Sequence, residues 1–326
     1  MPGLFLIDRF RSGFVSVALA AAMLCQAAVF GADVTPLEKD AYAAAMLDAM
    51  ANATQSEVSR NLLAVVGEKD KTNDKKLHDA SIKWEGEPGA SRVMVACFMS
   101  RDTYDQYYKA NLDAHLPTYT LTKSLWVTVV PELKNYFIGK ICPPDRKRVV
   151  AALGLNPARD YQVILEMWVD PAALFRPAPD PEATDHEATV STRTGVGSWA
   201  FSNDTNPFLQ FNDEATFVDH QGGTPYTFRQ WFAWNASQCY QMTDPKDLST
   251  WGTPWTRLGY TYDWGKLSGH VGLSEFILRI DPTVNGGQLT VTLVKAIDSS
   301  TQAWMRYFSC ESPTVSEEDA PAVDTR

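Results

Sequence analysis

One glutamate stands apart because of its neighbours. Glu275 lies within residues 271–280 (VGLSEFILRI), an apolar run whose length and composition are typical of a buried strand. Side chains alternate along a strand, so Leu273, Glu275 and Ile277 share one face. A carboxylate between two apolar neighbours either meets water at a sheet margin or faces a cleft. In a cleft it can stabilise positive charge that develops during a reaction, which makes Glu275 a candidate catalytic residue.

Residues 251–264 (WGTPWTRLGYTYDW) are unusually dense in aromatic side chains. Exposed Trp and Tyr rings stack on sugars, and a nearby Arg or Asp can orient the ligand by hydrogen bonds. The same rings, if buried, would only pack the loop onto the core. The loop is therefore an alternative site for a glycan or another small molecule, formed by Trp251, Trp255, Arg257, Tyr262, Asp263 and Trp264.

Other familiar catalytic patterns are missing from the sequence. There is no G-x-S-x-G elbow, no P-loop and no G-x-G-x-x-G. His186-Glu187 begins like the zinc motif H-E-x-x-H, but Val190 stands where the second His must be. The acidic residues 180–187 have the oxygen ligands of a calcium site without the spacing of an EF-hand, so they indicate a solvated loop. We predict no metal site.

The N-terminus has the pattern of an export signal. Arg9 and Arg11 precede an apolar stretch at residues 14–30, and Val29-Phe30-Gly31 before Ala32 fits signal peptidase. We expect residues 1–31 to be removed, which leaves a secreted or periplasmic protein with no membrane span. The formal net charge of −10 gives no basic field for a phosphate backbone, so nucleic acid is not an expected partner.

The cysteine count agrees with export. Outside the signal segment the chain has Cys97, Cys142, Cys239 and Cys310, an even set that predicts disulfides in an oxidising compartment. Four cysteines allow three pairings. We favour Cys97–Cys142 and Cys239–Cys310, because each pair closes a loop within one half of the chain. We then expect no thiol in the mature protein.

The order of predicted elements indicates an α+β fold. Capping boxes at residues 35–38 and 54–57 predict a pair of helices in an N-terminal segment, residues 32–67. A charged linker, residues 68–90, precedes the globular α+β domain at 91–310, and an acidic tail, 311–326, is predicted to be disordered.

Within the globular domain we predict a mixed or antiparallel sheet with interleaved helices and long aromatic-rich loops. The two last strands are predicted to form a hairpin, because an Asn285-Gly286-Gly287 turn separates them. The predicted strands are residues 92–99, 125–130, 161–169, 271–280 and 289–296.

This series resembles the ADP-ribosyltransferase-like fold of many secreted bacterial toxins. Residues 92–104 look like the opening strand and helix of that fold, and Trp126-Val127-Thr128 is similar to its second strand, where a Ser/Thr element supports the site. Residues 161–169 resemble the next strand, and residues 273–277 resemble the late strand that bears the catalytic glutamate. The resemblance covers roughly residues 92–297 and is a matter of pattern.

The resemblance implies NAD as a substrate. Enzymes with this fold cleave the nicotinamide–ribose bond through a cationic, oxocarbenium-like sugar. Glu275 would stabilise that charge, Thr128 would support Glu275, and Tyr104 would stack on the nicotinamide ring.

One feature departs from the family pattern. The first strand of the family carries an Arg or His that binds the dinucleotide, and the matching position here is Cys97. Arg92 and Arg101 lie at the ends of the strand, where one of them could substitute, and Arg101 is our candidate cofactor-binding residue beside Tyr104. Whether the chain is an enzyme therefore stays open at this point. The alternatives are a non-catalytic envelope or glycan-binding protein that uses residues 251–264, and an interaction protein whose N-terminal helices bind a protein partner. The surroundings of Glu275 and the exposure of the tryptophans separate these possibilities.

Overall fold

The computed structural model describes residues 34–51, 53, 55–65, 81–140, 142–181, 183, 185–188, 216–217, 226–280 and 288–309. The predicted signal segment, the acidic tail and Cys310 lie outside these residues. Helices combine with a mostly antiparallel sheet, which confirms the α+β class. Within the described part of the chain, no helix is long and apolar enough to cross a membrane.

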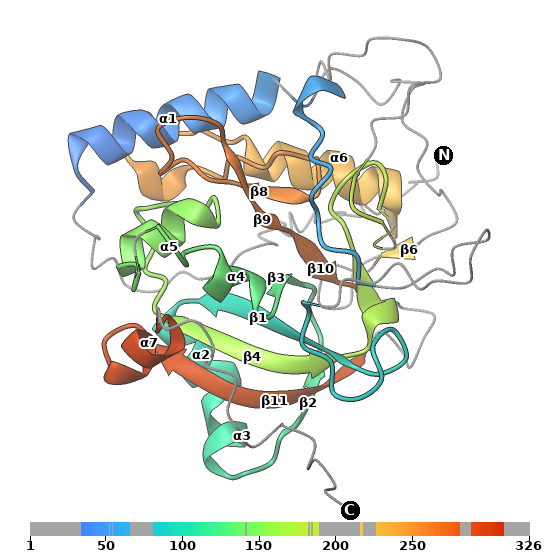
Figure 1. The fold of residues 1–326 in the computed structure, drawn as a ribbon. Coiled ribbons are helices and arrows are strands. Elements are labelled where there is room, and N and C mark those ends of the chain that lie inside the picture. Colours follow the sequence, from blue (N-terminus) through green and yellow to red (C-terminus); the bar gives the residue numbers. More distant parts are fainter. Residues whose placement is uncertain are drawn as a thin grey trace, which may run out of the picture.

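The central feature is a seven-stranded sheet in which every neighbouring pair of strands is antiparallel. Its long strands lie in the lower half of the view in Figure 1. In spatial order the strands are β2 (Thr118–Leu121), β11 (Leu289–Asp298), β4 (Val163–Val169), β1 (Val93–Met99), β3 (Leu125–Val129), β10 (Phe276–Leu278) and β5 (Leu174–Phe175).

The sheet divides between β1 and β3. Strand β1 pairs with β4 along its whole length, but it pairs with β3 only at Val95↔Val129 and Ala96↔Thr128. Beyond Ala96 the two strands no longer share a ladder. The half that contains β1 therefore separates from the half that contains β3, β10 and β5, and the separation opens a space between them.

The apolar run of β1 is explained by burial on both faces of the sheet. Val95 belongs to the core cluster on one face, whereas Met94 and Ala96 belong to a cluster on the other. A strand that is covered on both sides reads as continuously apolar rather than alternating. Short helices cover both faces, and side chains cap the first turns of three of them.

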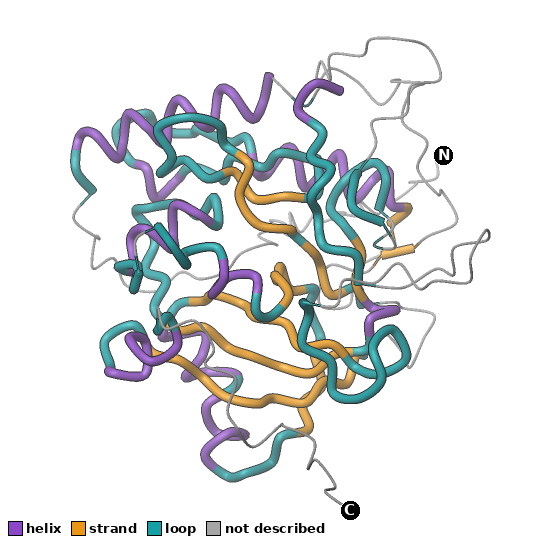
Figure 2. The backbone as a smooth tube through the Cα atoms, viewed as in Figure 1, coloured by secondary structure: helices purple, strands orange, loops and turns teal. Residues whose placement is uncertain are grey.

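Helices α4 (Glu132–Asn135), α5 (Arg146–Ala152) and α7 (Gln302–Tyr307) cover the face of Met94 and Ala96, whereas α2 (Arg101–Tyr107) and α3 (Lys109–Asp113) pack on the face of Val95. A second layer occupies the upper half of Figure 1, and loops connect much of it, as the teal tube in Figure 2 shows. It contains α1 (Pro36–Ala51), α6 (Phe228–Cys239), and the two paired strands β8 (Tyr260–Tyr262) and β9 (Val271–Ser274). Smaller elements are η1 (Gln55–Glu57), η2 (Pro171–Ala173), η3 (Leu248–Thr250), β6 (Thr216–Phe217) and β7 (Tyr226–Thr227).

Helix α1 is docked firmly on the body of the protein. The Tyr42 hydroxyl donates to the carbonyl of Gly252 at 2.6 Å. The buried Arg257 guanidinium donates to the carbonyls of Ala49 at 2.8 Å and Met50 at 3.0 Å, at the C-terminal end of the helix. A cation there satisfies carbonyls without helical partners and opposes the helix dipole.

The predicted second N-terminal helix is wrong. Only the single turn η1 forms, and Leu62 and Val65 instead donate backbone hydrogen bonds to the carbonyls of His186 (2.9 Å) and Ala183 (2.8 Å). Both apolar side chains are buried. Long-range pairing and burial therefore outweigh the local capping signal at residues 54–57.

The predicted hairpin between residues 271–280 and 289–296 is also wrong. Strand β10 pairs with β3 and β5, whereas β11 pairs with β2 and β4 in the other half of the sheet. Phe276, Ile277 and Leu278 are all buried, so β10 needs a partner on each edge and cover on each face. A hairpin with β11 would have given β10 a hydrogen-bonded partner on only one of its two edges.

The predicted disulfide pairing is wrong as well. Cys97 and Cys239 are buried thiols that form no disulfide, and each of the two predicted pairs contained one of them. Cys142 is disulfide-bonded, and neither Cys97 nor Cys239 is its partner. Cys97 and Cys239 belong to hydrophobic clusters, where a thiol packs as a small apolar side chain.

We therefore expect alkylation of unfolded, unreduced protein to label Cys97 and Cys239 but not Cys142. In the native protein both thiols should react slowly, because they are only 8% and 4% exposed and because burial raises the pKa of Cys239 to about 12. Peptide mass spectrometry gives the answer for each cysteine. Absence of label from both Cys97 and Cys239 after unfolding would contradict this arrangement.

Candidate functional site

A large cleft opens where the sheet divides. Its volume is about 1250 Å³, more than a drug-sized ligand needs. Its lining comes from the end of β1 and the start of α2, from β3, and from two later segments, residues 153–162 and parts of 249–262. Of the residues singled out in the sequence, the cleft brings together Cys97, Arg101, Thr128, Trp255, Tyr262 and Glu275.

Glu275 lies between β9 and β10, and its side chain lines the cleft. Its backbone N–H donates to the carbonyl of Gly259 at 2.9 Å, which fixes the strand against the loop. The Oε2 atom is buried and has no hydrogen-bond partner among the described residues. Burial raises the pKa of Glu275 well above its usual range, so the carboxyl group retains its proton at pH values where an exposed glutamate is ionised.

Hydrogen bonds through Glu132 hold the residue that precedes Glu275 in place. The Thr128 hydroxyl donates to Oε2 of Glu132 at 2.9 Å, and Oε1 of Glu132 accepts the backbone N–H of Ser274 at 2.8 Å. Thr128 therefore acts on the residue next to Glu275 through Glu132. No sequence pattern identifies Glu132 beyond its place in the first turn of α4, because its two partners lie on different strands.

The two residues expected to hold the cofactor have different surroundings. Arg101 lines the cleft and forms an ion pair with Asp298 of β11. Tyr104 is buried and is not among the described residues that line the cleft, and its ring packs 5.9 Å from the Arg101 guanidinium. Tyr104 therefore offers no open face to a ligand. The aromatic residues that do line the cleft are Phe98, Tyr107, Tyr108, Tyr119, Trp126, Tyr161, Trp255, Tyr260 and Tyr262.

The aromatic segment 251–264 is packed inside the protein. Trp255 is 3% exposed and contacts Phe232 of α6, with 4.7 Å between the ring centres. Trp264 meets Tyr42 of α1 edge to face at 5.7 Å. Trp251, Arg257 and Asp263 are also buried, and Tyr262 is half-buried. The segment thus presents no row of exposed rings. Two of its candidate residues, Trp255 and Tyr262, instead line the large cleft.

The acidic segment 180–187 has a structural contact in its described part. Asp185 pairs with Nη1 of the fully buried Arg176 at 3.1 Å. The same guanidinium donates to the carbonyls of Leu63 and Glu187, each at 3.1 Å. Among the described residues there is no group of His, Cys, Asp and Glu side chains that could hold a metal ion.

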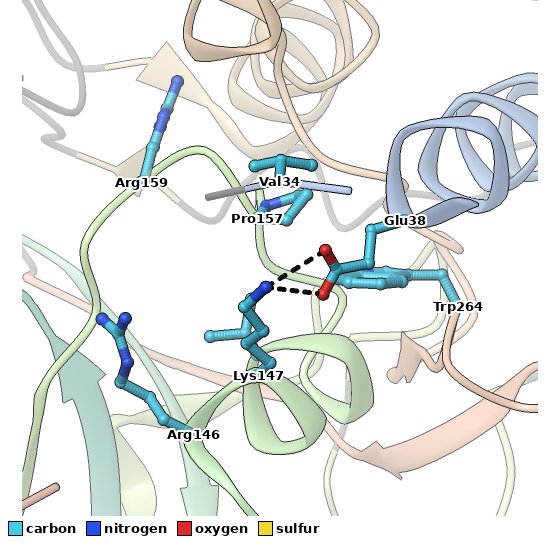
Figure 3. A pocket seen from close by; sticks show the side chains of 8 residues that line it. Val34, Glu38, Arg146, Lys147, Pro157, Arg159 and Trp264 are labelled. Carbon is cyan, nitrogen blue, oxygen red and sulfur yellow. Dashed lines mark hydrogen bonds and ion pairs between the residues drawn. The ribbon is translucent and has the colours of Figure 1, made fainter. Parts of the chain in front are cut away.

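A second hollow lies between α1 and α5, and Figure 3 shows it from close by. Lys147 points toward Glu38 there, and the distance from Nζ to Oε1 is 3.1 Å. The hollow has a volume of about 10 Å³, barely enough for one water molecule, so it is not a ligand site. Its ion pair serves to fasten α1 to the body. Arg159 lines both this hollow and the large cleft.

Comparison with protein-family models, curated proteins and solved structures gave no match to this chain.

Proposed function

We propose that the cleft binds NAD and that the chain is an exported, ADP-ribosyltransferase-like protein that cleaves the nicotinamide–ribose bond. The observation that supports this most directly is the carboxyl group of Glu275, which lines the cleft with a buried oxygen that lacks a partner. Such an oxygen points to a ligand, because buried polar atoms in folded proteins are nearly always hydrogen-bonded.

The chemistry of NAD matches the electrostatics of this carboxyl group. The nicotinamide ring of NAD is positively charged, and bond cleavage transfers that charge to the sugar. Burial keeps Glu275 protonated, but a cationic ligand in the cleft favours the ionised form, so binding should release a proton. The carboxylate then faces the developing sugar cation in a site of low dielectric, where such an interaction is strongest.

The rest of the cleft has groups suited to a dinucleotide. Arg101, Lys123 and Arg159 line it, and cationic side chains bind phosphate oxygens by charge-assisted hydrogen bonds. They would take the place of the missing Arg or His, because Cys97 stands in the wall where the family carries that cation. Glycan binding by residues 251–264 is not proposed, since their rings are buried.

The test is hydrolysis of NAD, in which water replaces the acceptor and yields ADP-ribose, nicotinamide and a proton. We expect wild-type protein to release nicotinamide slowly, and Glu275→Gln to reduce that rate by about 10²-fold or more, the scale for one preorganised electrostatic group. Asp102→Asn is the matched control, because Asp102 is an exposed carboxylate at the margin of the same cleft. Its rate should equal that of wild type. Chromatography measures the product.

Two results would contradict the proposal in different ways. No nicotinamide release by wild type, together with no NAD-induced change in Tm, would remove NAD as the substrate. Release that is unaffected by Glu275→Gln would remove Glu275 as the catalytic residue.

A further inference from the structure

Two buried polar atoms in the cleft wall lack partners among the described residues. One is Oε2 of Glu275, and the other is Nε1 of Trp255. Trp255 is 3% exposed and lines the cleft, as Glu275 does. The indole N–H is a donor only, so it needs an acceptor. A donor and an acceptor left together in one cleft indicate a ligand group that carries the opposite pair.

Packing places both side chains on the same side of β10. Glu275 and Ile277 are two residues apart in an extended segment, so their side chains share a face. Ile277 belongs to the same buried cluster as Trp255. Ile277 also lies opposite Trp126 in the sheet, and the Trp126 and Trp255 rings are 6.0 Å apart and perpendicular. The side chains that carry the two unpartnered atoms therefore lie close together in the wall of the cleft.

Helix α6 supports this placement independently. Cys239 is in the cluster with Trp255, and Tyr240 packs against that cluster and donates to the Trp255 carbonyl at 2.5 Å. The nearby Glu275 carboxyl group also contributes to the raised pKa values of Cys239 and Tyr240, after the larger effect of burial. Glu275 therefore lies near the two residues that pack against Trp255.

We infer that Trp255 and Glu275 together recognise a primary carboxamide. The amide oxygen accepts the hydrogen bond of Trp255 Nε1, and the amide N–H donates to Glu275 Oε2. This inference rests on the proposed function and identifies the part of the substrate that these residues recognise, the carboxamide of the nicotinamide ring. The second oxygen of Glu275 is then left for the sugar.

The arrangement predicts selectivity among three dinucleotides. NAD satisfies both atoms. The 3-acetylpyridine analogue keeps the carbonyl but has no N–H, and it should bind about tenfold more weakly because Glu275 loses its donor. The nicotinic acid analogue replaces the amide with a carboxylate, which carries no donor for Glu275 and adds a negative charge beside it. It should bind more weakly still. Isothermal titration calorimetry with the full chain measures all three.

A substitution at Trp255 completes the test. Trp255→Phe should weaken both NAD and the acetylpyridine analogue about tenfold, because both use the carbonyl. Trp231→Phe is the matched control: Trp231 is also 3% exposed and in the same cluster, but it is not among the described residues that line the cleft. It should leave the three affinities unchanged. If Trp255→Phe does not fold, the wild-type selectivity decides alone.

The experiment distinguishes failure of carboxamide recognition from failure of the proposed function. Tight NAD binding with no preference among the three dinucleotides would overturn carboxamide recognition and leave the proposed function standing. If wild type does not bind NAD, the proposed function fails, and binding of free nicotinamide and 3-acetylpyridine then tests the inference by itself. Preference for nicotinamide that Trp255→Phe abolishes would support it, and equal binding would overturn it.

Discussion

Replacing Asp263 with alanine should destabilise the protein by about 3–5 kcal/mol, the usual effect of removing one partner from a buried ion pair. The Asp263 side chain is fully buried, and its carboxylate accepts two hydrogen bonds from Arg148 of α5, at 2.9 Å and 2.6 Å. It also accepts the Tyr136 hydroxyl of α4 and the backbone N–H of Gly265. One side chain thus joins two helices to the β8–β9 segment.

The loss of stability in Asp263→Ala should be large because cationic side chains surround this carboxylate. The Arg148 side chain is only 18% exposed, and Lys140 and Lys266 lie over the Tyr136 ring, at 3.7 Å and 5.3 Å from its centre. Without Asp263 these three cations would have no carboxylate at the centre of the network. The remaining Arg148 would then be a partly buried and uncompensated charge.

The same helix supplies a matched control. Arg146 also pairs with an aspartate, Asp160, but these side chains are 32% and 40% exposed. Asp160→Ala should therefore cost no more than about 1 kcal/mol. Urea unfolding of both variants measures the difference. Equal free energies of unfolding for the two variants would contradict the structural role of the Asp263 network.

Asp263 also illustrates what sequence reasoning could not reach. Its residue type and its aromatic neighbours indicated a ligand-orienting role, and only the approach of Arg148 and Tyr136, more than a hundred positions away in the chain, assigns it to the core. The burial of Trp255 was equally inaccessible from the sequence. The sequence shows that the ring is present, but whether it is exposed depends on the position of α6.

Elements defined by their own pattern were predictable. The apolar strands β1, β3 and β4 follow from run length and composition, which are local properties, whereas the predicted strand 271–280 is interrupted at Glu275 between β9 and β10. Strand partners are not local. The Asn285-Gly286-Gly287 turn indicated a hairpin, yet the burial of Phe276 and Leu278 in the core required strands β3 and β5 as neighbours. The cleft arises where β1 and β3 stop pairing beyond Ala96, which is also a property of long-range contacts, so its existence could not be predicted.

The second large effect has the opposite sign: Glu275→Gln should stabilise the protein at neutral pH. Burial raises the pKa of Glu275 well above the value of 4.5 that applies to an unfolded chain. The folded state therefore binds the proton more tightly than the unfolded state does. Below about pH 4.5 both states are protonated and ionisation has no effect on stability. As the pH rises toward the folded pKa, the unfolded state ionises first, and the wild-type protein loses stability.

Glutamine is neutral at every pH and escapes this loss. The Tm of Glu275→Gln should thus equal that of wild type near about pH 4 and exceed it near about pH 8. The expected difference is at least about 2–4 °C, which corresponds to about 1 kcal/mol in a domain of this size. Differential scanning calorimetry at the two pH values measures it, and Asp102→Asn, at an exposed site, should show no such difference.

The raised pKa of Glu275 should also make ligand binding depend on pH. A cationic ligand favours ionised Glu275, so NAD affinity should increase as the pH rises toward the pKa of the free protein, where less proton release is needed. In Glu275→Gln that pH dependence should disappear. A variant that is more stable than wild type but less active would mean that the buried carboxyl group serves function at the expense of stability. A lower Tm for Glu275→Gln near about pH 8 would instead mean that a cation already pairs with Glu275, and the carboxyl group would then be part of the core.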